Sequence, residues 1–357
     1  MHVPWGWIKQ RPHFLAEQLS DNVEVDIFVT KSFRTSNLTA NTTKLNITTI
    51  FKFPFERFKI IRFINIKIVQ FLLKYKYSIQ KYKFIWVTDL RLYPFVENSL
   101  TNKQKLIYDC MDDVLEFEVL KEQQDELENI ENKLFQNADL ILFSSKELKS
   151  RKVEKYNLLN DSYGLVYNAL DRSLINAEIF DDYDNLFEEY KQNNYKILTY
   201  IGTISSWFDF EVIRKSLKDF EDIVYFIIGP VEQNIEVLKH DRIKYFGSVE
   251  HKYVKTLVLK SDILVMPFKL NKLVLAVDPV KMYEYIAFGK KIISVKYDEL
   301  EKFSEHLILY ENYDEFKTIL MNVSDIKDVN ILNNDFIELN TWKKRKEDIM
   351  TLLENIS

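Results

Sequence analysis

The sequence is poor in cysteine, and its histidines are scattered. Cys110 is the only cysteine among 357 residues, so no intramolecular disulfide can form and nothing indicates an oxidising compartment. The five histidines show none of the His-x3-His or Cys/His spacings that are typical of a zinc site. We therefore expect no disulfide, no bound metal and no cofactor.

Long apolar runs and a strong charge of one sign are also lacking. Nowhere do about 18 uncharged apolar residues stand together, and residues 1–11 contain no apolar signal core. The formal net charge of −5 argues against a general polyanion binder, so nucleic acid is not an expected partner. We expect a cytoplasmic protein whose membrane contact, if it has one, is peripheral.

Length and apolar content favour two folded domains. A single hydrophobic core stops growing near roughly 250–300 residues, whereas this chain has 357 residues, of which 46% are apolar. Two series of β-rich runs alternate with helical stretches, and this order predicts an α/β protein with parallel sheets. The domains expected are residues 1–175 and 195–335, joined by an acidic interdomain stretch at 176–194 and followed by a terminal segment at 336–357.

The expected elements follow from apolar runs and helical periodicity. In the first domain, strands are expected at residues 24–29, 84–88, 105–109, 139–143 and 164–167, and helices at 11–20, 57–80, 119–137 and 146–156. In the second domain, strands are expected at residues 196–201, 223–228, 243–246, 262–266 and 291–295. Ser144 and Glu147 have the spacing of a capping box, which predicts a helix start after the fourth strand.

Four segments carry the most specific pattern. They are residues 4–12 (PWGWIKQRP), 108–113 (YDCMDD), 200–209 (YIGTISSWFD) and 278–289 (DPVKMYEYIAFG). In this order they resemble GT-B glycosyltransferases of bacterial surface-polysaccharide clusters. The resemblance implies a GT-B fold, in which two Rossmann-like domains with parallel sheets face a central cleft, and a terminal helix that packs back toward the first domain. It also implies sugar transfer from a nucleotide-sugar donor, with a UDP-sugar favoured, to a lipid-linked or cell-surface glycan acceptor.

The last of these segments indicates a donor site. Asp278 suits an N-cap and Pro279 a first helical turn, so a helix is expected to begin here and to offer its N-terminus to a phosphate. The resemblance implies that Lys281 contacts the donor diphosphate and that Glu284 binds the ribose hydroxyls, with Asp278 beside them. A solvated surface lysine is the alternative for Lys281. Many retaining relatives have glutamate at the position of Ala276, so the retaining pattern is incomplete and the stereochemistry stays open.

Two further segments have less specific roles. Gly202 and Thr203 follow the first strand of the second domain, where they either lie beside the donor phosphates or simply form a tight turn between strand and helix. In the first domain, Trp5, Gly6 and Arg11 are expected on the acceptor side. Arg11 either faces an acceptor phosphate or caps the interdomain cleft.

Asp112 and Asp113 are the candidates for catalysis. They follow the expected strand 105–109, and ligands of open α/β sheets bind beyond the carboxyl ends of strands. In an inverting enzyme a carboxylate accepts the proton of the attacking hydroxyl. In a retaining enzyme the same loop would orient the acceptor or the donor sugar. The structural alternative is that one of the two aspartates caps a helical turn.

Residues 51–84 are basic and aromatic. They hold nine lysines and arginines against the single acid Glu56, interleaved with phenylalanines and tyrosines. Basic side chains are attracted to anionic leaflets, and amphipathic ones bury their stems there. We expect this region to dock on an anionic membrane or on the lipid-linked acceptor, which places the protein at the inner face of the cell membrane. The alternative is a helix packed on the sheet with solvated lysines.

Other functions fit parts of the sequence. Ala276 permits a catalytically inactive, glycosyltransferase-like scaffold of a polysaccharide-assembly complex, although the acids at 112–113 and the Lys281/Glu284 pair favour an enzyme. An epimerase acting on nucleotide sugars with the same fold is a third candidate, but it would need no basic membrane-facing surface. A GT-A enzyme would need an Asp-x-Asp metal site. Residues 182–184 match those letters, but they lie in the acidic interdomain stretch, away from any strand end.

Overall fold

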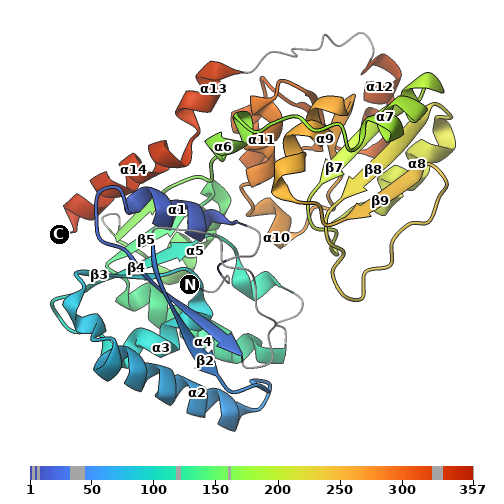
Figure 1. The fold of residues 1–357 in the computed structure, drawn as a ribbon. Coiled ribbons are helices and arrows are strands. Elements are labelled where there is room, and N and C mark those ends of the chain that lie inside the picture. The colour runs from blue at the N-terminus through green and yellow to red at the C-terminus, as the bar shows by residue number, and fades with distance from the viewer. Residues whose placement is uncertain are drawn as a thin grey trace. The chain divides into compact units, whose positions relative to one another are not determined.

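The chain consists of two compact units. The computed structural model describes residues 1, 5, 9–32, 45–117, 122–159, 162–323 and 333–356. Unit 1 comprises Met1–Asn168 and Trp342–Ser357, and unit 2 comprises Ala169–Thr341 (Figure 1). Both are built from parallel strands that alternate with helices, as the sequence pattern predicts.

The strands of unit 1 form two separate sheets. In one sheet β1 (Asp26–Ser32) pairs with β2 (Asn46–Lys52), and in the other β3 (Phe84–Val87), β4 (Lys105–Cys110), β5 (Leu140–Phe143) and β6 (Tyr163–Leu165) pair in that order. All these pairs are parallel. β5 is buried along its whole length, as expected for a parallel strand that is covered on both faces.

Helices cover these sheets. They are α1 (Arg11–Leu19), α2 (Lys59–Phe71), α3 (Tyr93–Val96), α4 (Gln124–Asn137), α5 (Lys146–Tyr156) and α14 (Trp342–Asn355). A π-helical turn follows α2 at Leu72–Lys76, and short 3₁₀ turns lie at Ile79–Lys81, Leu90–Leu92, Glu97–Ser99 and Val114–Glu116. The terminal helix α14 packs on α1, where the rings of Phe14 and Trp342 stack with centroids 5.1 Å apart.

Unit 2 has one six-stranded parallel sheet. Its strands are β7 (Lys196–Ile201), β8 (Ile223–Ile228), β9 (Ile243–Gly247), β10 (Ile263–Met266), β11 (Lys291–Val295) and β12 (Ile308–Tyr310). They are arranged in the order β12-β11-β10-β7-β8-β9. The first strand, β7, therefore lies in the middle, as in doubly wound nucleotide-binding sheets.

The helices of unit 2 are mostly short. They are α6 (Arg172–Ile175), α7 (Asp184–Gln192), α8 (Phe210–Asp219), α9 (Val254–Lys260), α10 (Lys272–Leu275), α11 (Val280–Ala287), α12 (Tyr313–Asn322) and α13 (Asn334–Leu339). Two 3₁₀ segments lie at His251–Tyr253 and Asp298–Phe303.

The structure differs from the sequence-based expectation in several elements. Strands β2 and β12 were not expected, and α2 ends at Phe71 although its helical pattern continues to residue 80. Residues 176–194 are not a separate interdomain stretch, because they include α7 and belong to unit 2. Phe187 of α7 is buried, with its ring centroid 4.9 Å from that of Phe226 in β8.

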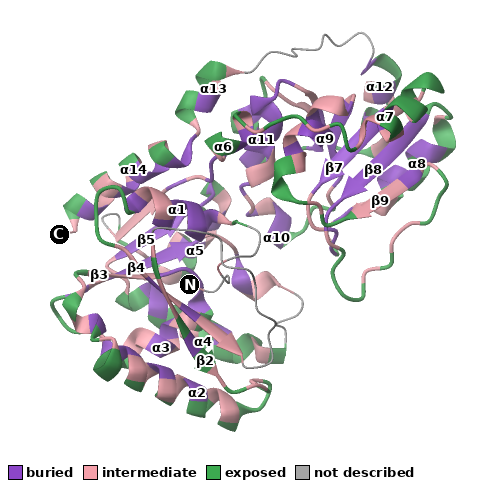
Figure 2. Cartoon of the chain, viewed as in Figure 1, coloured by how far each residue is buried: buried purple, intermediate pink, exposed green. Residues whose placement is uncertain are grey.

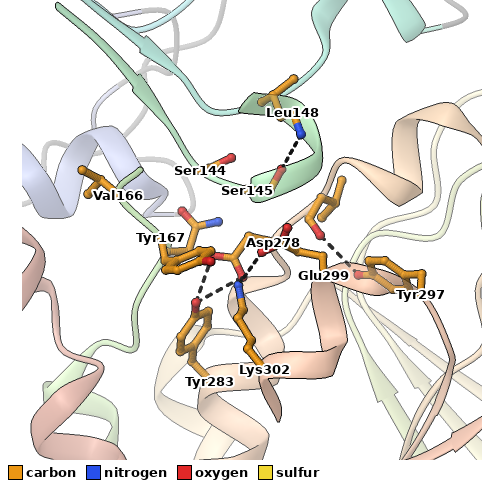
Figure 3. A network of polar contacts seen from close by, with 12 residues as sticks. Ser144, Ser145, Leu148, Val166, Tyr167, Asp278, Tyr283, Tyr297, Glu299 and Lys302 are labelled. Carbon is orange, nitrogen blue, oxygen red and sulfur yellow. Dashed lines mark hydrogen bonds and ion pairs between the residues drawn. The ribbon is translucent and has the colours of Figure 1, made fainter. Parts of the chain in front are cut away.

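The start of α5 also differs. Ser145 is the N-cap, because its Oγ accepts a hydrogen bond of 3.1 Å from the Leu148 amide (Figure 3). Ser144 does not cap the helix, since its hydroxyl donates instead to the carbonyl oxygen of Met111 at 2.7 Å. The capping box expected from Ser144 and Glu147 is therefore wrong by one residue. Through its hydrogen bond to Met111, Ser144 instead stabilises the loop that follows β4.

Candidate active site

The acidic loop of unit 1 lies where the sequence predicts, beyond the carboxyl end of β4. It lines a small cavity of about 70 Å³, to which Asp112, Asp109, Asp89 and Arg91 all contribute. These residues come from the ends of two adjacent strands, β3 and β4. The cavity therefore gathers carboxylates and one guanidinium at the edge of the sheet where ligands of α/β proteins bind.

Asp112 is the acid available for chemistry. Within the described part of the chain its carboxylate has no hydrogen-bond or ion-pair partner, and it is half-buried. Burial raises the pKa of this carboxyl from its ordinary 3.8 to about 6, helped by the neighbouring Asp89 carboxylate and opposed by the Arg11 guanidinium. A carboxylate with such a pKa binds and releases a proton near neutral pH, which general acid–base chemistry requires.

Asp113 is in a different environment. Its carboxylate is almost fully buried and lies 2.8 Å from Nζ of Lys152, which also lies 2.6 Å from the carboxylate of Glu131. The hydroxyl of Tyr156 donates to the second oxygen of Glu131. This network ties α4 and α5 to the loop, and it uses the charge of Asp113 for structure. The sequence reasoning missed Lys152, because nothing in the spacing of these residues indicates the contact.

Asp89 and Arg91 were also missed. Asp89 follows β3 by two residues and accepts hydrogen bonds from the Arg91 amide at 2.8 Å and from its guanidinium at 2.8 and 2.6 Å. The pair is bidentate, while 46% of the Arg91 side chain stays exposed. A signal was present, since Asp89 directly follows an expected strand end. The exposed guanidinium could contact an anionic ligand group beside Asp112.

Arg11 holds secondary-structure elements together. It is 3% exposed, and its Nε donates to Asp109 at 2.9 Å while Nη1 donates to the carbonyl oxygen of Val166 at 2.7 Å. These bonds join the start of α1 to the ends of β4 and β6. These contacts test neither of the two roles expected for Arg11, and both roles stay predictions. The ring of Trp5 packs edge-on against His13, and Gly6 lies outside the described residues.

In unit 2 the segment before α11 differs from expectation. The N-cap residue is Pro279, and no side chain caps the helix. Asp278 is buried and accepts hydrogen bonds from the Tyr283 hydroxyl at 3.0 and 3.1 Å, while Lys302 lies 2.8 Å from it and 2.7 Å from Glu299 (Figure 3). The N-cap role expected for Asp278 is therefore wrong, because its carboxylate pairs with Lys302, which lies 24 residues away in the sequence.

Lys281 and Glu284 do come together. Nζ of Lys281 lies 2.9 Å from Oε2 of Glu284, one turn apart on α11. The Glu284 side chain is only 4% exposed, whereas 32% of the Lys281 side chain is exposed. The Lys281 side chain is thus partly exposed to solvent, and Glu284 takes up only part of the hydrogen-bonding capacity of its ammonium. Its ammonium lies at the first turn of α11, and a helix N-terminus and a cation together suit an anion.

Packing explains the glycine after β7. The amide of Gly202 donates to the carbonyl oxygen of Ile228 at 2.8 Å, and a Cβ at this position would lie 2.6 Å from the Tyr200 hydroxyl. Gly229 has a φ of +143°, and a Cβ there would lie 1.9 Å from the Gly202 oxygen. Close packing therefore accounts for glycine at both positions. Donor contacts of Gly202 and Thr203 stay a prediction.

A second surface of unit 1 surrounds α2. Asn65 anchors it from inside, because this buried side chain exchanges hydrogen bonds of 2.8 and 3.0 Å with the backbone of Phe53. The opposite face of α2 is largely exposed, whereas the strand before it, β2, is only partly exposed (Figure 2). We call the α2 surface the set of exposed apolar side chains Phe51, Phe53, Phe55, Phe58, Ile60, Phe63, Ile64, Phe71 and Tyr75.

The described residues offer neither a metal cluster nor a membrane-spanning helix. No group of three or more His, Cys, Asp or Glu side chains in the described ranges could hold a metal ion. Among the helices that the structure describes, none is both long enough and apolar enough to cross a membrane.

The sequence is similar to that of a curated bacterial protein. This is TuaH of Bacillus subtilis (strain 168), a glycosyltransferase provisionally assigned to teichuronic acid biosynthesis, 24% identical over 216 residues. The match covers 57% of this chain and 54% of the relative, so the similarity spans about half the length of that protein. No family model matches the sequence.

Solved structures match nearly the whole chain. The sucrose-phosphate synthase of Thermosynechococcus elongatus superposes with a TM-score of 0.74 at 13% identity, covering 97% of this chain and 92% of that one. This chain has the GT-B fold. HepE of Anabaena, whose structure contains UDP and glucose, superposes on this chain with a TM-score of 0.67 at 12% identity. The match covers 99% of this chain and 98% of HepE. The fold class and the resemblance to GT-B glycosyltransferases are therefore confirmed.

Proposed function

We propose that this GT-B chain is a glycosyltransferase that takes a sugar from a UDP-sugar and transfers it to a lipid-linked or cell-surface glycan. The observation that carries the proposal is the Asp112 carboxylate, which is half-buried, has a raised pKa and lacks a partner within the described residues at the carboxyl end of β4. The GT-B fold and the similarity to glycosyltransferases support it.

In an inverting reaction Asp112 acts as the general base. An acceptor hydroxyl gives its proton to the carboxylate as its oxygen bonds to the anomeric carbon, and the bond from that carbon to the nucleoside diphosphate breaks. Such a base contributes about 10²- to 10⁴-fold to the rate. In a retaining reaction the same carboxylate orients the acceptor or the donor sugar. Asp113 supports the loop through Lys152 in either case.

Unit 2 binds the donor in this proposal. The ammonium of Lys281 and the first turn of α11 contact the diphosphate, and the carboxylate of Glu284 accepts hydrogen bonds from the ribose hydroxyls. The existing contact of 2.9 Å between Lys281 and Glu284 holds both side chains in place before the donor binds. The buried Asp278–Lys302 pair fixes the segment that leads into the helix.

The acceptor side of the proposal involves a membrane. The α2 surface exposes aromatic rings, and cations lie over some of them: Nζ of Lys67 is 5.5 Å from the centroid of Phe63, and the Arg57 guanidinium is 4.8 Å from that of Phe58. Exposed rings next to cations suit the headgroup region of an anionic leaflet. The protein then works peripherally at the inner face of the cell membrane, where a lipid-linked acceptor would lie.

A scaffold without activity is the second candidate, and Ala276 favours it. This side chain is 1% exposed, where many retaining relatives are expected to carry glutamate. A scaffold would bind the nucleotide sugar through Lys281 and Glu284 without turning it over. Binding alone therefore cannot separate the two functions.

The test has two steps. A thermal-shift panel of nucleotides and nucleotide sugars identifies the donor, because a ligand at 100 times its Kd stabilises the native state by about 2.7 kcal/mol. The donor found is then incubated with the protein and membrane lipids, and release of the nucleoside diphosphate is measured. Binding with release supports the enzyme, binding without release supports the scaffold, and no response to any nucleotide contradicts both.

A further inference from the structure

A large apolar cavity separates the two sheets of unit 1. Its volume is about 450 Å³, about three times the ~150 Å³ of engineered apolar cavities that stay dry and bind small hydrocarbons. Side chains of α1, α2 and α3 line it, including Leu15, Val69 and Phe95. Protein interiors rarely leave such space unfilled, because they pack like organic crystals.

The cavity has the outline of a missing strand. Two runs of six consecutive residues line it, residues 23–28 leading into β1 and residues 83–88 spanning β3. Six residues of extended chain measure about 20 Å. β3 is the last strand in the order of its sheet, and no ladder joins it to β1 or β2 among the residues that the structure describes. The edges of β1 and β3 thus border the cavity, which we call the slot.

Unit 2 shows what occupies the equivalent position. There β7 lies between β8 and β10, pairs with both in parallel, and is followed in the chain by α8. In unit 1 the order is β2-β1, then the slot, then β3-β4-β5-β6, and α1 precedes β1 as α8 precedes β8. The slot is therefore the counterpart of β7, the central strand of a doubly wound sheet.

Met1 marks the carboxyl end of the slot. Its amino nitrogen donates to the carbonyl oxygen of Phe28 at 2.7 Å, just as the amide of Gly202, after β7, donates to Ile228 at 2.8 Å. Asp89, beyond β3, is close enough to act on the same amino group electrostatically. A chain that enters Met1 through the slot would therefore run parallel to both β1 and β3.

The Met1 amino group occupies the place of a peptide N–H, like that of Gly202 after β7. Burial lowers the pKa of the Met1 amino group to about 5, because an ammonium is poorly solvated at this position. A peptide N–H would make the same hydrogen bond to Phe28 without carrying a charge.

We infer that this slot takes a seventh parallel strand of unit 1 next to β1 and β3, about six mostly apolar residues long, supplied by residues that precede Met1 in the same chain. The inference does not depend on the proposed function. The strand is mostly apolar, because a central parallel strand is covered on both faces, as β7 is in unit 2. It leaves no 450 Å³ site for a ligand.

The test compares two N-terminal extensions of the complete chain. One repeats the β7 sequence, Lys-Ile-Leu-Thr-Tyr-Ile, before residue 1, and the matched control carries six residues of alternating glycine and serine. We expect the first extension to raise Tm by about 5 °C or more and to slow amide exchange at residues 25–28 and 85–87 at least about tenfold. The Gly/Ser extension should change neither. Equal behaviour of the two extended chains would overturn the inference.

Two further measurements identify the source of the occupant. The protein isolated from its native cells should carry residues before Met1 when its N-terminal peptide is sequenced, whereas a native start at Met1 would overturn the assignment to the same chain. Dodecanoate serves as the probe for an apolar ligand. It should not raise the Tm of the β7-extended chain, and an equal rise in all three chains would show a ligand cavity instead of a strand slot.

Discussion

The carboxylate of Asp113 lies 2.8 Å from Nζ of Lys152, and both side chains are buried. The adjacent Asp112 has no such partner within the described residues and has a carboxyl pKa of about 6. Two neighbouring aspartates that look equivalent in the sequence therefore differ in chemistry. One is committed to an ion-pair network and the other is available to a substrate.

The first prediction separates the two acids. Asp112→Asn should lower kcat about 10²- to 10⁴-fold with donor affinity unchanged, because it removes the base and keeps the shape. Asp113→Asn should keep kcat within about threefold but lower stability by roughly 1–3 kcal/mol, since it weakens a buried charge-assisted contact. Initial rates and thermal melts of both variants check this. Equal loss of activity in both would show that the acids act together.

The second prediction concerns the pH dependence of turnover. A base must be deprotonated, so kcat/KM should fall about tenfold per pH unit below the pKa of Asp112, near pH 6. An ordinary carboxylate would place this limb near pH 4. The pH–rate profile of the parent is compared with the residual activity of Asp112→Asn, which should lack the limb. An unchanged limb in the variant would assign it to another group.

The third prediction concerns stability. Because folding raises the pKa of Asp112 above its unfolded value, the folded state favours the protonated form. This destabilises the protein as pH rises through 4 to 6, by at most about 3 kcal/mol. Asp112→Asn should therefore melt at a higher temperature than the parent at pH 7.5, and the difference should vanish near pH 4. A constant difference across this range would contradict the raised pKa.

The fourth prediction concerns the donor. Lys281→Ala should weaken nucleoside diphosphate binding about ten- to a hundredfold by calorimetry, because it removes a charge-assisted phosphate contact. It also leaves the buried Glu284 carboxylate without its cation, so the melting temperature should fall. Adding Glu284→Gln should restore the melting temperature and leave binding weak.

A matched control for this experiment is Lys296→Ala. This lysine belongs to the same unit but forms an exposed pair with Glu311, and neither residue is part of α11, so its loss should affect neither binding nor melting. If Lys281→Ala and Lys296→Ala bound nucleotide equally well, the donor site would lie elsewhere.

The fifth prediction concerns the α2 surface. The parent should co-sediment with vesicles containing anionic lipid more strongly than with neutral ones. Phe63→Ser combined with Phe71→Ser should reduce this binding at least about tenfold, because each buried ring contributes roughly 1.5–3 kcal/mol. Leu339→Ser is the control, as an exposed apolar side chain of unit 2. No binding by the parent, or equal binding to both lipids, would contradict the membrane contact.

Much of the fold could be predicted from the sequence. The apolar runs that form β4, β5, β7, β8 and β11 were placed within one residue, because a buried parallel strand is a continuous local signal. β2 was missed since its residues are mostly polar and half-exposed. The segments at strand ends were predicted too, since strand, turn and helix follow one another along the chain.

What the sequence determined by itself is therefore local: the positions of strands and helices, the glycine turns, and the acidic loop after β4. Tertiary structure alone decided which acid is available, because Lys152 stands 39 residues from Asp113 in sequence. It likewise turned Asp278 away from the helix end, toward Lys302, 24 residues away. Burial and charge pairing depend on which distant groups packing brings together, and no spacing in the sequence encodes that choice.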